Sequence, residues 1–165
     1  MTVTVRIRWS AALAAMVAVA VLAGCGSSAG RRPAPSIGAP SGPAVILRFG
    51  NHVAAGTLFD TPESRQLAAM LPATVDLKDV WGQAKSGRLP STLTAGGSTP
   101  IHDPRPGDIY FWPTSEVLAI YYDDLGQTVP DPGLIHLGAL TTGLDDLAAT
   151  GRRTTVRIDL APTSR

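Results

Sequence analysis

The chain has 165 residues and carries 14 Lys and Arg against 13 Asp and Glu, for a formal net charge of +1. This length suffices for one domain with a hydrophobic core. The near-neutral charge, and basic residues that are not interleaved with aromatic ones, exclude a nucleic-acid-binding protein. The sequence contains one cysteine, which excludes a disulfide framework within the chain.

The N-terminal segment has the organisation of a secretory signal. Arg6 and Arg8 give it positive charge, and residues 11–23 are almost entirely Ala, Val, Leu and Met. This apolar run is too short to span a bilayer comfortably. The lone cysteine, Cys25, follows it directly in the sequence Leu-Ala-Gly-Cys, which resembles the lipobox of bacterial lipoproteins.

The resemblance to the lipobox implies that the chain is cleaved before Cys25 and that the thiol receives a diacylglycerol. Residues 1–24 are then a lipoprotein signal peptide. The two acyl chains anchor the protein to membrane lipid, on the extracytoplasmic face of the cell membrane. The alternative is an ordinary signal peptide with an incidental cysteine.

Residues 26–43 are rich in Gly, Ser and Pro and contain one bulky apolar residue, Ile37. Such a composition cannot bury enough surface to offset the entropy lost on ordering. We therefore expect residues 25–43, beginning at the lipidated cysteine, to form a disordered linker. Residues 44–165 are expected to form the folded domain.

The first part of the domain predicts a hairpin, a helix and a further strand. Residues 45–49 and 52–59 are strand-like and flank a Gly-Asn turn signal. Thr61 is a helix N-cap followed by Pro and Glu, which predicts a helix over 62–70. Residues 73–80 alternate between apolar and polar side chains and predict a strand.

The second part begins with an irregular segment, because residues 83–106 are rich in Gly, Ser, Thr and Pro. The elements expected after it are strands at 108–112, 117–122 and 134–140, a loop at 123–133, a helix at 142–149 and a strand at 154–160. Several short strands with two short helices, and no strand-helix-strand rhythm, favour an antiparallel barrel or rolled sheet.

Three segments of the domain carry a family resemblance. Residues 107–113 read Gly-Asp-Ile-Tyr-Phe-Trp-Pro, residues 118–122 read Leu-Ala-Ile-Tyr-Tyr, and residues 133–138 read Gly-Leu-Ile-His-Leu-Gly. Together they resemble the signature of the bacterial cyclophilin-like fold family of stand-alone barrels. The resemblance covers residues 44–161 and implies a mainly β fold with two short helices and a closed cyclophilin-like barrel.

True cyclophilins are peptidyl-prolyl isomerases that polarise the prolyl amide with an arginine beside an apolar pocket. The run Arg88-Leu89-Pro90 is loosely similar to the segment that carries this arginine. When residues 134–138 are compared with the cyclophilin strand that begins with the pocket histidine, Leu134, and not His136, falls at the position of that histidine. The resemblance thus implies an alternative function, an extracytoplasmic isomerase that assists the folding of exported proteins, with Arg88 as its support.

Aromatic residues are few, yet several gather on two expected strands. In a barrel, Phe111 faces the same way as Ile109, and Tyr110 the same way as Trp112, so one set is core and the other can line a cleft. The alternative is that both sets are core plus a covered edge. The candidate residues of a ligand cleft are Arg88, Phe111, Trp112, Tyr121, Tyr122 and His136.

Other chemical signals in the sequence are weak. His136 lies within an expected strand, a position that is also typical of a structural histidine. His52 and His102 show no spacing that suggests a shared metal, and the acids of the 123–131 loop miss the EF-hand pattern. There is no nucleophile elbow and no phosphate-binding Gly-rich loop. We therefore predict no catalytic constellation, no metal and no cofactor.

The leading hypothesis is a membrane-anchored lipoprotein whose barrel serves as a binding or accessory module. Its expected ligand is a peptide or a small apolar molecule held against Trp112 and Tyr121 or Tyr122, with Arg88 as a hydrogen-bond donor. The isomerase is the enzyme alternative, and a purely structural surface protein is the third.

Overall fold

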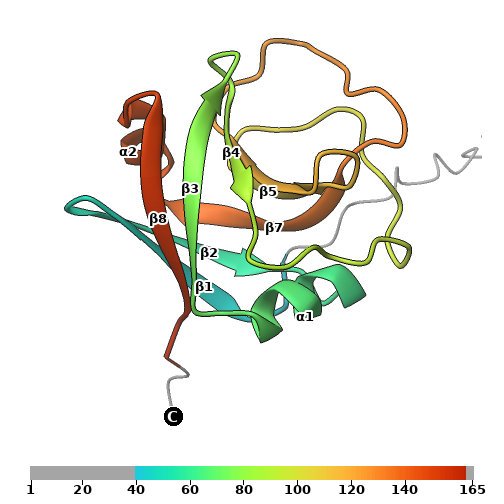
Figure 1. Ribbon diagram of the computed structural model, residues 1–165, viewed down its shortest axis with the longest axis horizontal. Helices are drawn as coiled ribbons and strands as arrows, with labels where there is room; N and C mark the ends of the chain where they lie inside the picture. The colour runs from blue at the N-terminus through green and yellow to red at the C-terminus, as the bar shows by residue number, and fades with distance from the viewer. Residues whose placement is uncertain (1–39, 163–165) are drawn as a thin grey trace, which may run out of the picture. The chain divides into compact units, whose positions relative to one another are not determined.

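The computed structural model describes residues 40–162. Within them the chain forms eight strands and two helices (Figure 1). In chain order they are β1 (Ala44–Phe49), β2 (His52–Leu58), α1 (Pro62–Ala69), β3 (Ala73–Val80), β4 (Ala84–Arg88), β5 (Asp108–Trp112), β6 (Val117–Tyr121), β7 (Ile135–Thr142), α2 (Leu144–Ala149) and β8 (Arg153–Leu160). The predicted signal peptide, Cys25 and most of the predicted linker lie outside the described residues. In the described part, neither helix is long and apolar enough to cross a membrane.

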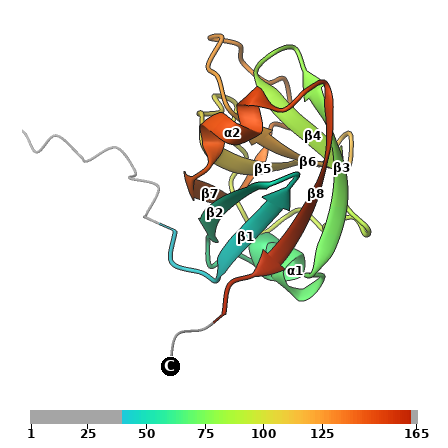
Figure 2. The same cartoon turned by 90° about the vertical axis from the view of Figure 1, so that its left-hand side faces the viewer.

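The strands close into one antiparallel barrel. Their order around it is β1, β2, β7, β5, β6, β4, β3 and β8, and β8 pairs with both β1 and β3. Figure 2 shows β8 between these two strands. Closure gives every strand two neighbours, so the sheet has no free backbone edge. The prediction of a mainly β protein with two short helices and a closed barrel is confirmed.

Local sequence signals explain the first elements. Gly50, with a φ of 53°, reverses the chain between β1 and β2. Thr61 caps α1, because its Oγ1 accepts a hydrogen bond from the Ser64 amide at 3.3 Å. Pro62 occupies the first turn of α1, where the missing amide hydrogen is not needed. The hairpin and the helix therefore follow from residues close in sequence.

The prediction that residues 83–106 are irregular is wrong for Ala84–Arg88, which form β4 between β3 and β6. This strand lacks an apolar alternation because of the two residues that it places inside the barrel. Lys85 and Gly87 face inward, since they pair with core residues of β6. A side chain at Gly87 would collide with the backbone oxygen of Asp76. The inner face of β4 therefore carries no apolar signal.

The segment after β4 is irregular, as predicted, and a buried carboxylate holds it. Glu63, in the first turn of α1, is buried, and its Oε1 accepts hydrogen bonds from the amides of Gly97 at 2.7 Å and Gly96 at 3.2 Å. Its Oε2 accepts one from the Ser98 hydroxyl at 2.8 Å. Burial alone would raise the pKa of the Glu63 carboxyl, but these hydrogen bonds hold its pKa below the ordinary value. The loop is therefore fastened to α1.

The main hydrophobic core fills the inside of the barrel. Each helix contributes one buried leucine to it, and in Figure 1 the two helices lie toward opposite ends of the barrel. In β5, Ile109 and Phe111 belong to this core, whereas Tyr110 and Trp112 join a second apolar cluster. The predicted alternation of β5 is confirmed. The second cluster lies on the outer face of the sheet, where the candidate site is found.

Candidate functional site

The outer face of β3, β4, β5 and β6 carries a groove of about 260 Å³. Its lining includes the aromatic residues Trp81, Trp112 and Tyr121 and the small residues Ala84, Ser86 and Ala119. We call these six residues the aromatic groove. Aromatic walls over a floor of small side chains are typical of a site for an apolar group.

Strand register assembles the aromatic groove from segments that are distant in sequence. Ala84 lies opposite Tyr121, and Ser86 lies opposite Ala119, in the pairing of β4 with β6. Residues directly opposite each other share one face of the sheet, so the short β4 side chains leave space beside the tyrosine ring. Trp112 comes from β5, which pairs with the other side of β6. The depth of the groove therefore depends on small residues in β4.

Trp81 stands at the turn between β3 and β4 and is 68% exposed. Its φ of 55° is left-handed, a conformation that bulky residues rarely adopt. The amide of Gly82 donates a hydrogen bond to Asp79 Oδ1 at 2.9 Å and helps to hold the turn. The turn thus presents a large apolar ring to solvent at the groove. Trp81 is not among the predicted cleft residues, although Gly82, two residues after the expected strand 73–80, signals such a turn.

Arg88, the predicted donor, lines a neighbouring hollow of about 490 Å³ and not the aromatic groove itself. The two share four lining residues, Lys78, Ser86, Ser115 and Val117, so Arg88 belongs to the same continuous depression. Its Nη1 is 3.2 Å from Oε2 of Glu116, and its side chain is 72% exposed. An ion pair this exposed contributes little free energy. Arg88 is therefore not held in a fixed position against the aromatic residues.

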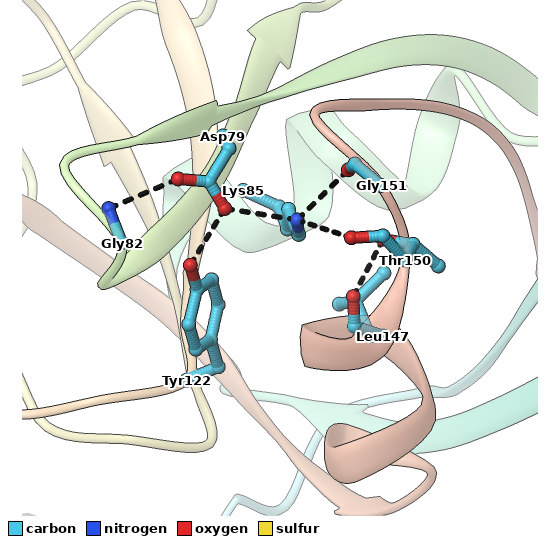
Figure 3. Close-up of polar contacts among 7 residues, drawn as sticks. All are labelled: Asp79, Gly82, Lys85, Tyr122, Leu147, Thr150 and Gly151. Atoms are coloured by element: carbon cyan, nitrogen blue, oxygen red, sulfur yellow. Dashed lines mark hydrogen bonds and ion pairs between the residues drawn. The ribbon is translucent and has the colours of Figure 1, made fainter.

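Tyr122 joins a polar cluster at the end of the barrel and does not line the groove, which corrects the sequence prediction. Its hydroxyl donates to Asp79 Oδ2 at 2.6 Å, and Lys85 Nζ donates to the same oxygen at 2.9 Å (Figure 3). The hydrogen bonds from Tyr122 and Lys85 hold the pKa of Asp79 below its ordinary value. Burial, together with the hydrogen bond to Asp79, raises the pKa of Tyr122 to about 12. Tyr122 is therefore part of this polar cluster, whereas its neighbour Tyr121 lines the groove.

Phe111, which the sequence analysis places in the cleft, does not line the groove either. It is 1% exposed and packs inside the barrel, because alternation along β5 turns it away from Trp112. Tyr121 is 4% exposed and lines the groove. Of the predicted cleft residues, Trp112 and Tyr121 therefore come together in the groove, with Arg88 beside them.

His136 lies on the outer face of β7 and lines a different hollow, of about 530 Å³. Its ring stacks on that of Tyr110, with the ring centroids 4.8 Å apart. It also forms a T-shaped contact with the ring of Phe59, with the centroids 4.5 Å apart. Its Nε2 is 3.2 Å from Oδ2 of Asp108. We call the depression formed by these four residues and by part of the segment 100–106 the histidine hollow. The predicted cleft residues are thus divided between two sites.

Imidazole and carboxylate groups meet in pairs on this side of the molecule. Besides His136 with Asp108, His102 Nε2 lies 3.7 Å from Oδ1 of Asp131. Within residues 40–162, no three His, Cys, Asp or Glu side chains come together in a way that could hold a metal ion.

Comparison with known proteins identifies the class to which this barrel belongs. The model of the cyclophilin-like family matches residues 47–159. The solution structure of a hypothetical protein from Archaeoglobus fulgidus is similar, with a TM-score of 0.57 and 13% sequence identity, covering 73% of this chain and 95% of that one. No curated protein matches the chain by sequence. The chain belongs to the cyclophilin-like family, as its strand motifs predicted.

Proposed function

We propose that this protein is a membrane-anchored, extracytoplasmic lipoprotein whose cyclophilin-like barrel is a binding module. In this proposal, the aromatic groove holds an apolar side chain of a peptide, or a small apolar molecule. The observation that carries it is Trp81, a large apolar ring that is 68% exposed beside a groove floored by small residues.

Hydrophobic burial supplies the driving force for such binding. Covering one large apolar side chain is worth about 2 kcal/mol. Trp81 and the half-buried Trp112 present two such surfaces to one ligand. Ser115 and Lys78, which also line the groove, offer polar groups for the backbone of a bound peptide. These features support recognition of an apolar segment flanked by ordinary peptide groups.

The binding experiment uses fluorescence from the groove tryptophans. A panel of short peptides that differ in one central apolar residue, proline included, is titrated into the full chain. Binding shifts the emission of Trp81 and Trp112 to shorter wavelength, and Trp112→Ala weakens it. Leu160→Ala, which removes another exposed apolar side chain outside the groove, is the matched control. If Trp112→Ala and Leu160→Ala bind every peptide with equal affinity, the aromatic groove is not the binding site.

The membrane anchor rests on the Leu-Ala-Gly-Cys sequence and is tested separately. Wild-type protein is expected in the membrane fraction, with a mass that includes a diacylglycerol. Cys25→Ser is expected to be released or to remain as uncleaved precursor. A variant that is secreted and cleaved like the wild type would argue for an ordinary signal peptide.

The isomerase alternative depends on a positively charged donor held against the prolyl amide. Arg88 is mostly exposed and paired with Glu116, which weighs against this role. A protease-coupled assay on a proline peptide decides between the two functions. Acceleration that disappears in Arg88→Ala would favour the isomerase over the binding module.

A further inference from the structure

The histidine hollow contains an unusual polar residue. Within residues 40–162, His136 is the only residue with buried side-chain polar atoms that lack a hydrogen-bond partner, and both of its ring nitrogens are in this state. The Nε2–Asp108 Oδ2 distance of 3.2 Å allows an ionic contact, without the alignment of a hydrogen bond. Buried polar groups in native proteins nearly always find a partner. The site is therefore incomplete as it stands.

The neighbours of His136 determine what kind of partner is missing. Asp108 Oδ2 accepts a hydrogen bond from the Tyr110 hydroxyl at 2.9 Å, and that hydroxyl in turn accepts one from the Arg105 amide at 3.1 Å. Because Nε2 faces this carboxylate, we consider the tautomer with the proton on Nε2 and the lone pair on Nδ1. Asp108 Oδ1 has no hydrogen-bond partner among the described residues. In this tautomer the Nε2–H faces Asp108 without the alignment of a hydrogen bond, whereas the lone pair of Nδ1 has no donor. The Nδ1 lone pair and Asp108 Oδ1 are thus acceptors to which a ligand can donate.

The lining of the hollow favours a donor that is positively charged and has an apolar stem. Two carboxylates, those of Asp108 and Asp103, line it, against the single guanidinium of Arg105. The ring of Phe59 can attract a cation, and Pro100 adds apolar surface for a stem. Arg105 itself is exposed and forms no side-chain hydrogen bond or ion pair with residues 40–162.

We propose that the histidine hollow binds an ammonium or guanidinium group of a peptide, with Asp108 as its counter-ion. An ammonium has three N–H donors and a guanidinium has five, so either group can satisfy a carboxylate oxygen and an imidazole nitrogen together. The group comes from a Lys or Arg side chain or from a free amino terminus. This site is separate from the aromatic groove and does not depend on the function proposed for the groove.

The probes are four matched pentapeptides, titrated into the full chain by calorimetry. Three have blocked termini and a central Lys, Arg or norleucine, and the fourth has norleucine and a free amino terminus. Binding of the Lys or Arg peptide assigns a side chain, and binding of the fourth alone assigns the amino terminus. Equal binding of all four, or binding of none, would overturn the proposal.

Three variants locate the binding site and test whether it binds a cation or an anion. Asp108→Asn keeps the shape of the side chain and is expected to weaken binding about tenfold or more, the effect of losing a charged hydrogen bond. Asp124→Asn, in the exposed loop after β6, is the matched control and leaves the affinity unchanged. Arg105→Gln removes a like charge from an exposed position and is expected to strengthen binding. Weaker binding in Arg105→Gln would mean an anion site and would contradict the proposal even if Asp108→Asn fails to fold.

A fourth variant separates this proposal from the previous one. Trp112→Ala alters the aromatic groove and is expected to leave affinity for the Lys and Arg peptides unchanged. A loss of that affinity would place the cation at the groove and not at the histidine hollow.

Discussion

Lys85 Nζ lies 2.9 Å from Asp79 Oδ2, and its side chain is only 1% exposed. The same nitrogen donates to the backbone oxygens of Thr150 at 3.0 Å and Gly151 at 3.1 Å, just after α2 (Figure 3). All three ammonium donors are therefore used within the protein. This cation connects the β3–β4 turn, which carries Trp81, to the end of α2. The groove is thus supported by an ion pair on the inner side of the same turn.

Replacing this lysine is expected to destabilise the protein strongly. Lys85→Met removes the cation from Asp79, which keeps only its bonds from Tyr122 and Gly82, and it removes the Lys85 donor from two backbone oxygens. Breaking a largely buried pair in this way costs about 3 kcal/mol or more. The measurement is the free energy of unfolding in urea. Lys78→Met, on the outer face of β3, is the matched control, and a similar loss in both variants would show that the buried ion pair has no special role.

Stability is expected to fall in acid because two carboxyls have lowered pKa values. Glu63 is held below its ordinary value of 4.5, and Asp79 below 3.8, so the unfolded chain takes up protons before the folded protein does. Their contribution is complete above these ordinary values and is lost as the pH falls through them toward the folded values. Urea unfolding between about pH 6 and about pH 3 measures the slope. Glu63→Gln should flatten it, and an unchanged slope would contradict the role of Glu63.

Gly87 is expected to tolerate no side chain. A β-carbon there would meet the backbone oxygen of Asp76 and the side chain of Val75, so Gly87→Ala should cost about 1–3 kcal/mol of unfolding free energy. At Gly151 nothing lies within 4 Å of such an atom, which makes Gly151→Ala the control. Thermal unfolding of the two variants compares them, and equal midpoints would show that β4 can move away from β3.

Trp81→Asn is expected to raise stability and lower binding. Asparagine accepts the left-handed conformation, and an Asn-Gly pair suits the two consecutive positive φ values at residues 81 and 82, so the variant should gain about 1 kcal/mol. It also removes one wall of the aromatic groove. Glu116→Asn replaces another residue with a φ of 55° and should gain stability without loss of peptide binding. Trp81→Asn that binds the groove peptides as the wild type does would place their site elsewhere.

Much of the fold could be predicted from residues close in sequence. The N-cap at Thr61 and the alternation of Ile109 and Phe111 with Tyr110 and Trp112 identify their elements because each signal lies within a few residues. Strand β4 could not be predicted in this way. Its inner face carries a charged Lys85, and that charge is acceptable only because Asp79 and the end of α2 surround it.

For the functional sites, too, some features follow from the sequence and others only from the tertiary structure. The sequence by itself determined the family, through its strand motifs, and it is the sole basis for expecting a lipid at Cys25, because a lipobox is recognised as a linear segment. Only the tertiary structure decided which strands bring their side chains together, since strand pairing places Ala84 beside Tyr121 and leaves Tyr122 with Lys85. The histidine hollow has the same origin. Asp108 and His136 meet because β5 pairs with β7, and strand pairing is a long-range choice that no short segment specifies.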